Sequence, residues 1–219
     1  EIRYWRASRR NSAPDRSVSR ICHKDGGWKV KVAAVVTVLL GLGANLPGTW
    51  GTPLQSIARA LDRISTLAIG KVVEASSFYM SHPVGPISQP DYINAVACAR
   101  FDMPAGQLLR QIKAIESAVG RVGQRRRWDA RELDIDLLDV GGEVSGWDVP
   151  HDVARPQPLV LPHPMLHLRP FVLVPLNELA PDWRHPVFGM TASALLARLP
   201  PVGDDLRRLP TPPPMPASD

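Results

Sequence analysis

The chain has 219 residues, 44% of them hydrophobic, and a formal net charge of +5. This length suits one globular domain with tails, and the two widely separated cysteines argue against a disulfide framework or a cysteine-based metal site. Residues 1–33 hold nine basic against three acidic side chains, which leaves 17 basic against 18 acidic in the remainder. A nearly neutral domain argues against a broad nucleic-acid surface and favours a site for a small anionic ligand.

The two ends of the chain differ in composition from the middle. Residues 1–33 lack hydrophobic periodicity, so we expect a basic, disordered extension, and residues 201–219 have the composition of a Pro-rich tail. The apolar run at 30–42 is too short to span a bilayer, and its Val content and following Gly-rich turn are typical of a buried first strand. We therefore predict one domain over residues 34–200, with no membrane association and a cytoplasmic location.

Strand-like patterns occur four times in this domain. Strands are expected over residues 34–42, 71–78 and 92–101, and a fourth from Leu133, where apolar residues alternate with acids. The glycines at the end of the first strand are not followed by a dinucleotide-binding or P-loop pattern. We therefore interpret them as part of a turn and nothing more.

Two helices are expected between these strands. Thr52 as N-cap and Pro53 as first residue begin one, and the other is predicted from Pro104 to Gly120. The order of strand, helix, strand, strand, helix, strand predicts an α+β fold with a ferredoxin-like βαββαβ core, an antiparallel sheet with helices packed on one face. The other face would be free to build a site, and an amphipathic segment at 191–199 would add a C-terminal helical cover.

The richest chemistry lies in residues 121–136, where arginines precede two carboxylates. Asp134 and Asp136 are two apart in the fourth strand, so both project from the same face. Carboxylates are the ligands that Mg²⁺ prefers, and a polyphosphate is the substrate that needs both Mg²⁺ and several arginines. This combination predicts phosphoryl chemistry. The arginines are Arg121, Arg125, Arg126, Arg127 and Arg131.

Each of these features also has a plainer interpretation. The two aspartates could decorate an exposed strand face, although acids are depleted in strands and repel one another there. The run at 125–127 is typical of a solvated loop, which makes Arg121 and Arg131 the better candidates. His163 and His167 have the spacing of a zinc pair on a helix, but Pro164 argues against that helix, and a role at a phosphate is favoured for His163.

Several short segments occur in order between residues 35 and 198. They are GLGANL at 41–46, SSFY at 76–79, QPDYINA at 89–95, Ile115-Glu116 with Gly120-Arg121, Arg127-Trp128, Arg131 with LDID at 133–136, and LPHP at 161–164. Together these segments resemble the 6-hydroxymethyl-7,8-dihydropterin pyrophosphokinases. That family has a ferredoxin-like α/β fold, uses ATP and two Mg²⁺ ions, and moves a diphosphate to the pterin hydroxymethyl group in folate biosynthesis, releasing AMP.

The resemblance implies roles for individual residues. It places Arg121, Arg131, Asp134 and Asp136 in the catalytic centre, with the two aspartates holding both Mg²⁺ ions. It assigns the ATP side to Lys113, Glu116, Arg121, Arg131, Leu137, His163 and Arg169, and a closing lid to Trp128. It assigns the pterin side to Ser81, Val84, Tyr92, Asn94 and Phe171, where Tyr92 and Phe171, otherwise taken as core aromatics, would stack on the ring.

Four positions depart from the family pattern: Gly123 where a second arginine is usual, Asp129 where a glycine is, His82 where a proline is, and Pro164 where an aromatic is. These departures bear on loop closure and turnover rather than on the substrate. The family implies ATP and the pterin as partners, dihydropteroate synthase or another folate-pathway enzyme as a candidate protein partner, and a monomer.

The alternative from another class is a ferredoxin-like nucleic-acid-binding module that uses the arginine loop. Such a module presents aromatic platforms on its central strands, whereas the fourth strand offers leucines, an isoleucine and acids, which repel RNA. The sequence therefore favours the enzyme.

Overall fold

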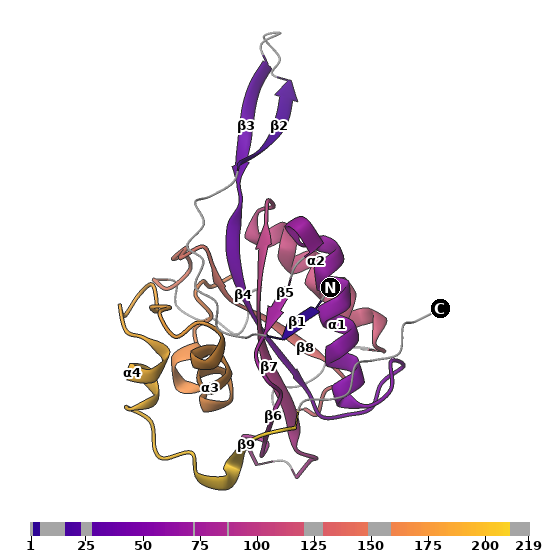
Figure 1. The fold of residues 1–219 in the computed structure, drawn as a ribbon, viewed down its shortest axis with the longest axis vertical. Helices are drawn as coiled ribbons and strands as arrows, with labels where there is room; N and C mark the ends of the chain where they lie inside the picture. Colours follow the sequence, from indigo (N-terminus) through magenta and orange to yellow (C-terminus); the bar gives the residue numbers. More distant parts are fainter. Residues whose placement is uncertain are drawn as a thin grey trace.

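The computed structural model describes residues 2–4, 16–22, 28–71, 73–86, 88–120, 129–148 and 159–210. Its main sheet runs in the order β1, β5, β7, β4, β8, with β6 paired to β7 and β9 paired to β6 (Figure 1). These strands are β1 (Ile2–Tyr4), β4 (Val36–Ala44), β5 (Val73–Ala75), β6 (Tyr79–Ser81), β7 (Tyr92–Phe101), β8 (Asp134–Val140) and β9 (Leu206–Arg208).

Helices cover both faces of this sheet (Figure 1). On one face lie α1 (Pro53–Leu67) and α2 (Ala105–Ala118), and on the other α3 (Pro170–Leu179) with α4 (Ala192–Leu196) packed against it. Short 3₁₀ turns complete the chain: η1 (Ile69–Lys71), η2 (Leu166–Leu168) and η3 (Gly203–Asp205). The α+β, ferredoxin-like prediction is confirmed. The expectation that the second face would be free is wrong over the part that α3 covers.

The start of α1 follows from local sequence. The Thr52 hydroxyl accepts from the Gln55 backbone N–H, and the Gln55 side chain accepts from the Thr52 N–H, a capping box next to Pro53. Three turns of the helix then bury Ile57, Leu61 and Ile64 against the sheet. Full burial of each such side chain contributes about 1.5–3 kcal/mol, so one apolar stripe holds this helix in place.

A second hydrophobic cluster forms on the opposite face. There the sheet contributes Leu39, Val96 and Leu138, and α3 packs Leu173 and Leu176 onto them. The central strands have apolar side chains on both faces here, so other elements must pack against both sides of the sheet. The layer that α3 forms therefore belongs to the core. This face of the sheet stays open only at the end near Gly43 of β4.

The strand predicted over 71–78 is present only as β5, and β6 begins just after the predicted range. Ala75 pairs with Ala97 of β7, whereas Tyr79 pairs with Asn94, so four steps on one side face three on the other. The extra residue forms a bulge, and the Ser76 hydroxyl accepts from the Val96 N–H at 3.0 Å within it. The bulge ends one strand and begins the next.

Strands also lie in both segments predicted to be without regular structure. At one end, β2 (Arg16–Cys22) and β3 (Trp28–Ala34) form an antiparallel hairpin that projects from the sheet, and β3 leads into β4 (Figure 1). Lys29 and Lys31 alternate with valines there, a period-two pattern that is typical of a strand. The prediction of a disordered segment gave more weight to the basic composition than to this alternation. At the other end, β9 lies within the predicted tail. The domain boundaries themselves stay a prediction.

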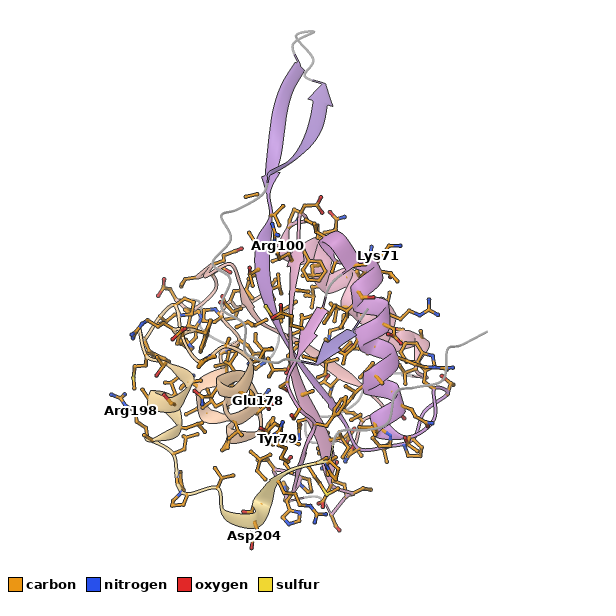
Figure 2. The ribbon with its side chains drawn as sticks, viewed as in Figure 1. Lys71, Tyr79, Arg100, Glu178, Arg198 and Asp204 are labelled. Atoms are coloured by element: carbon orange, nitrogen blue, oxygen red, sulfur yellow. The ribbon has the colours of Figure 1, made fainter. Side chains whose placement is uncertain are left out.

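Glu178 of α3 joins the C-terminal layer to the sheet edge (Figure 2). Its carboxylate accepts from the Tyr79 hydroxyl and the Ser77 hydroxyl, both at 2.8 Å, and from Arg208 of β9 at 3.3 Å. Burial and this hydrogen bond raise the pKa of Tyr79 to about 12, which keeps the phenol a donor. The Glu178 carboxylate thereby holds α3, β6 and β9 together.

No helix in the described part of the chain combines the length and apolar character needed to cross a lipid bilayer.

Lowering the pH is expected to destabilise the C-terminal layer through His185. The ring is fully buried among Trp147, Trp183 and Phe188, and burial, with a smaller effect of His167, lowers its pKa to about 4. Between pH 6.5 and 4 the unfolded chain takes up a proton that the folded state excludes, so stability falls as pH falls. We expect a loss of up to about 3 kcal/mol.

Urea denaturation at pH 7.5 and pH 4.5 measures this loss. His185→Gln, which cannot be protonated, serves as the control and should lose less stability over the same interval. Equal losses in the two proteins would assign the acid sensitivity to other groups.

Candidate active site

The pocket lies on the open end of the second sheet face, across β7, β4 and β8. Register places Asn94 of β7 opposite Gly43, and Gly43 opposite Asp134 of β8, so the three share a face. One row back, Gly41 pairs with Asp136. A cavity of about 300 Å³ opens there, between the sheet and the chain around Arg169. Polar side chains thus flank a strand whose facing positions are glycines.

The two glycines form the floor of this cavity. A Cβ added at Gly43 would lie 3.5 Å from Asn94 Oδ1 and 3.8 Å from Tyr92, ordinary contact distances, so the protein itself leaves room for one. A Cβ at Gly41 would come within 3.2 Å of Leu138. The expectation that the strand ends at residue 42 and that Gly43 begins a turn is wrong, because β4 continues through Ala44. Both glycines also line the pocket, a role that the sequence interpretation did not give them.

An arginine is paired with each predicted metal-binding carboxylate. Arg131 donates to Asp134 Oδ1 at 2.7 Å, and Arg169 donates to Asp136 Oδ2 at 3.2 Å. Burial, followed by repulsion from Asp136, raises the pKa of Asp134, while Arg131 opposes the shift. Two half-buried carboxylates on one face therefore carry a repulsion that a bound cation would relieve.

His163 stands behind Asp136 rather than in the pocket lining. Its Nε2 is 3.7 Å from Asp136 Oδ2, and its Nδ1 accepts from the Met165 N–H at 3.1 Å. Burial lowers the pKa of His163, although Asp136 pulls it upwards. A neutral imidazole protonated on Nε2 fits these contacts, and such a ring orients the carboxylate.

The predicted pterin-side residues meet at the opposite end of the cavity. Asn94 is buried and donates to Ser81 Oγ at 2.9 Å, which fixes its amide with Oδ1 on the Gly43 side. The Tyr92 hydroxyl reaches the Asp129 carbonyl at 3.3 Å. Phe171, at the first turn of α3, lies under the Arg169 guanidinium at 5.8 Å. Val84 completes the set and is 56% exposed.

Nine of the sequence-predicted site residues therefore line one cavity. They are Ser81, Val84, Tyr92, Asn94, Arg131, Asp134, Asp136, Arg169 and Phe171.

Three further predicted residues, all assigned to ATP, lie away from the lining. The buried Glu116 carboxylate accepts from Lys113 and from the Ile135 N–H, both at 2.8 Å, and so joins α2 to β8. Leu137 lies in the core beneath the sheet. Arg121 and Trp128, which carried the remaining phosphate and lid predictions, lie outside the described residues. The assignments of all five stay predictions.

Asn45 is a residue that the sequence analysis did not single out. Its buried amide donates to Gln89 Oε1 at 2.9 Å and to the Pro90 carbonyl at 3.0 Å, while its Oδ1 accepts from the Arg131 N–H at 2.7 Å. One side chain thereby links the loop before β7 with the segment before β8. The signal was present as an Asn directly after a Gly-rich strand end, but its three partners are 44, 45 and 86 residues away in the chain.

Replacing Asn45 by alanine is expected to lower the free energy of unfolding by about 2 kcal/mol, because the three hydrogen bonds of one buried amide are lost. Asn45→Asp is the matched variant, since it keeps the acceptor for the Arg131 N–H and loses both donated bonds. It should therefore retain the Arg131 link alone. Denaturant unfolding measures the effect, and a change below about 0.5 kcal/mol for the alanine variant would contradict the proposed linking role.

Comparisons with known proteins identify the family of this chain. The family model described as 7,8-dihydro-6-hydroxymethylpterin-pyrophosphokinase (HPPK) matches residues 39–181, well over half of the chain. A 2-amino-4-hydroxy-6-hydroxymethyldihydropteridine pyrophosphokinase of Haemophilus influenzae is 40% identical over 148 residues, which cover 68% of this chain and 84% of that protein. One of Pseudomonas aeruginosa is 38% identical, over 79% of this chain and 96% of that protein.

Solved structures support the fold. The chain is similar to a Plasmodium falciparum HPPK-DHPS crystal structure with a TM-score of 0.55 and 13% identity, over 75% of this chain and 43% of that one. It thus spans less than half of that longer protein. With the family match and the two bacterial relatives, the conclusion is that this chain belongs to the 7,8-dihydro-6-hydroxymethylpterin-pyrophosphokinase family, whose members carry out the pyrophosphokinase step of folate biosynthesis.

Proposed function

We propose that this pocket performs the family's reaction with ATP and Mg²⁺, through the residues that line it. The hydroxymethyl oxygen of 6-hydroxymethyl-7,8-dihydropterin attacks the β-phosphorus of ATP, the bond from that phosphorus to the oxygen shared with the α-phosphorus breaks, and AMP leaves. The observation that carries the proposal is the row of Asn94, Gly43 and Asp134, which places an amide and a carboxylate on either side of a glycine floor.

The amide end of the row suits a pterin. Since Asn94 Nδ2 is used by Ser81, its Oδ1 offers an acceptor towards the pocket, which complements an N–H edge of a planar heterocycle. Tyr92 and Phe171 supply aromatic surface from two different elements, and offset stacking on such rings contributes about 0.5–1.5 kcal/mol beyond the buried area. The Asn94 amide and the two aromatic rings would hold the pterin with its hydroxymethyl group towards the carboxylates.

The carboxylate end fits Mg²⁺ by its donor set. Asp134 and Asp136 present hard oxygen ligands on one face, and phosphate oxygens and water commonly complete such a site. Bound Mg²⁺ would neutralise charge on the carboxylates and on the transferring phosphates. Within the described residues no group of three or more His, Cys, Asp or Glu side chains is arranged to hold a metal. Any further ligands would have to come from the substrate or from water.

The two arginines would bind the phosphates. Arg131 and Arg169 enter the pocket from different segments, and guanidinium groups match phosphate oxygens with paired donors. The protein forms no covalent intermediate in this scheme, so positioning and charge stabilisation would supply the rate enhancement. Arg121 would be a further phosphate ligand and Trp128 part of a closing lid.

The test is to mix the protein with ATP, Mg²⁺ and 6-hydroxymethyl-7,8-dihydropterin and to identify the nucleotide product by chromatography. We expect AMP in an amount equal to the pterin diphosphate formed, and neither product without the pterin. Formation of ADP, or AMP release that does not depend on the pterin, would reject the proposal.

The proposal extends to the location and the partners of the protein. Cys98, on β7, is a free thiol, and the chain has one other cysteine, in agreement with a reducing cytoplasm. We propose a monomer that meets its substrates there. The HPPK-DHPS chains to which it is similar suggest a dihydropteroate synthase as a candidate partner.

A further inference from the structure

His82 lies in a row of three side chains that crosses the ends of three neighbouring strands. Ser81 pairs with Tyr92 of β7 on one side and with Leu206 of β9 on the other. One residue further along, the same register places His82 between Asp91 and Asp205. The contacts agree: Nδ1 is 2.7 Å from Asp91 Oδ1, and Nε2 is 4.0 Å from Asp205 Oδ1.

This row closes the base of the loop between β6 and β7. The loop leaves the sheet at His82 and returns at Asp91, and within it Val84 and Gln89 line the pocket, as does His82 at its base. The two residues just inside the sheet, Ser81 and Tyr92, line the pocket as well. A bond across the base therefore sets the distance between the two ends of a segment that forms one wall of the site.

The third member of the row ties this base to the C-terminal segment. The His82 backbone N–H donates to the Asp205 carbonyl at 3.2 Å, and β9 continues the pairing along β6. Residues 203–208 lie beyond the part of the chain that the family model matches, which ends at residue 181. The support for this wall thus comes partly from outside the matched region.

We propose that His82 is a positioning residue for the pterin-side loop, which it holds in its binding conformation by bridging Asp91 and Asp205. The inference rests on the proposed assignment of this end of the pocket to the pterin. Holding the loop beforehand lowers the ordering cost of binding, so the effect falls on the KM for the pterin rather than on kcat. The pairs are exposed, and exposed ion pairs are weak, so the expected factor is about two- to fivefold.

The charge of the imidazole controls the bridge. A protonated ring is hydrogen-bonded to Asp91 and is attracted to Asp205 by its charge, whereas a neutral ring keeps at most the hydrogen bond to Asp91. The hydrogen bond to Asp91 and the charges of Asp91 and Asp205 raise the pKa of His82 above 6.5, while slight burial and Arg207 act against them. Asp204, the other acid of η3 (labelled in Figure 2), lines the same surface hollow as His82, Asp91 and Asp205. The bridge is complete below the raised pKa and is weakened above it.

Steady-state kinetics over a range of pH tests the proposal with the full chain. In the wild-type protein the KM for the pterin should rise about two- to fivefold as pH passes upwards through the pKa of His82, with little change in kcat. His82→Gln should have the higher KM throughout, and His82→Lys, which stays charged, should keep a low KM at the higher pH. Ionisation of the substrates is common to all three proteins and cancels in the ratios.

Asp205→Asn should remove part of the pH effect, whereas Asp204→Asn, which loses the same charge one residue earlier, should not. An NMR titration of His82 gives a readout that does not depend on turnover: Asp205→Asn should lower its pKa and Asp204→Asn should change it less. An unchanged KM profile in His82→Gln, or equal pKa values in the two aspartate variants, would overturn the bridge. Failure of the wild-type protein to form pterin-dependent AMP would instead reject the proposed function, and the titration would still decide on the bridge.

Discussion

Asp134→Asn and Asp136→Asn are each expected to reduce pterin-dependent AMP formation by about a thousandfold or more, while the protein stays folded. Each change keeps the size of the side chain and removes one negative charge from the face that would hold Mg²⁺. Losing one preorganised charge contact at a reacting group commonly costs about a hundred- to a thousandfold in kcat, and a metal ligand supports several such contacts at once.

Stability separates this effect from unfolding. Burial and repulsion from Asp136 already disfavour the charged form of Asp134, so neutralising it removes a strain even though Arg131 loses its partner. We therefore expect the thermal unfolding midpoint of Asp134→Asn to stay within a few degrees of the wild type. Asp62→Asn, on the exposed face of α1, is the control for a lost charge, and its activity should be unchanged. Retained activity in both site variants would mean that the metal ions bind elsewhere.

Local patterns in the sequence predicted the elements that depend on neighbours along the chain. Thr52 and Pro53 placed the start of α1, and Gly120, whose φ is +107°, follows the end of α2 as expected. The alternation from Leu133 placed β8 and put both aspartates on one face. Caps and periodicity act over one or two turns, and for this reason the sequence alone is enough to find them.

Pairing between distant segments was not predictable in the same way. The bulge at Ser76 depends on the partner strand β7, twenty residues later in the chain. β9 has only three residues, and it forms because β6 offers an open edge that Arg208 and Leu209 can reach. No pattern inside either segment specifies such a contact, because its free energy comes from a surface that exists only after the fold has formed.

The candidate site shows the same division. Charged residues with an evident chemistry, such as Asp134 and Arg131, were found from type and spacing. Gly41 and Gly43 were not, because their contribution is the side chain that they lack, and this has meaning only once β7 and β8 are known to lie on either side. Asn45 is a similar case, because it contributes to the site by joining the loop before β7 to the segment before β8, and these segments are distant from it in the sequence.

Arg131→Ala is expected to lower kcat/KM by about a hundred- to a thousandfold, the range found when one charged contact to a transferring group is removed. The backbone of this residue should stay in place, because the Arg131 carbonyl accepts from the Asn45 and Leu46 N–H groups and its N–H donates to Asn45. The change therefore tests the guanidinium alone. Arg131→Lys keeps the charge but not the paired donors, so it should recover part of the loss.

The same measurement series separates the phosphate role from the ion pair with Asp134. If Arg131 served only to neutralise that carboxylate, Arg131→Ala combined with Asp134→Asn would be no worse than Asp134→Asn alone. If Arg131 also binds the transferring diphosphate, the double variant should be slower than either single one. Arg63→Ala, on the exposed side of α1, controls for a lost positive charge. A rate for Arg131→Ala within threefold of the wild type would exclude Arg131 from the phosphate site.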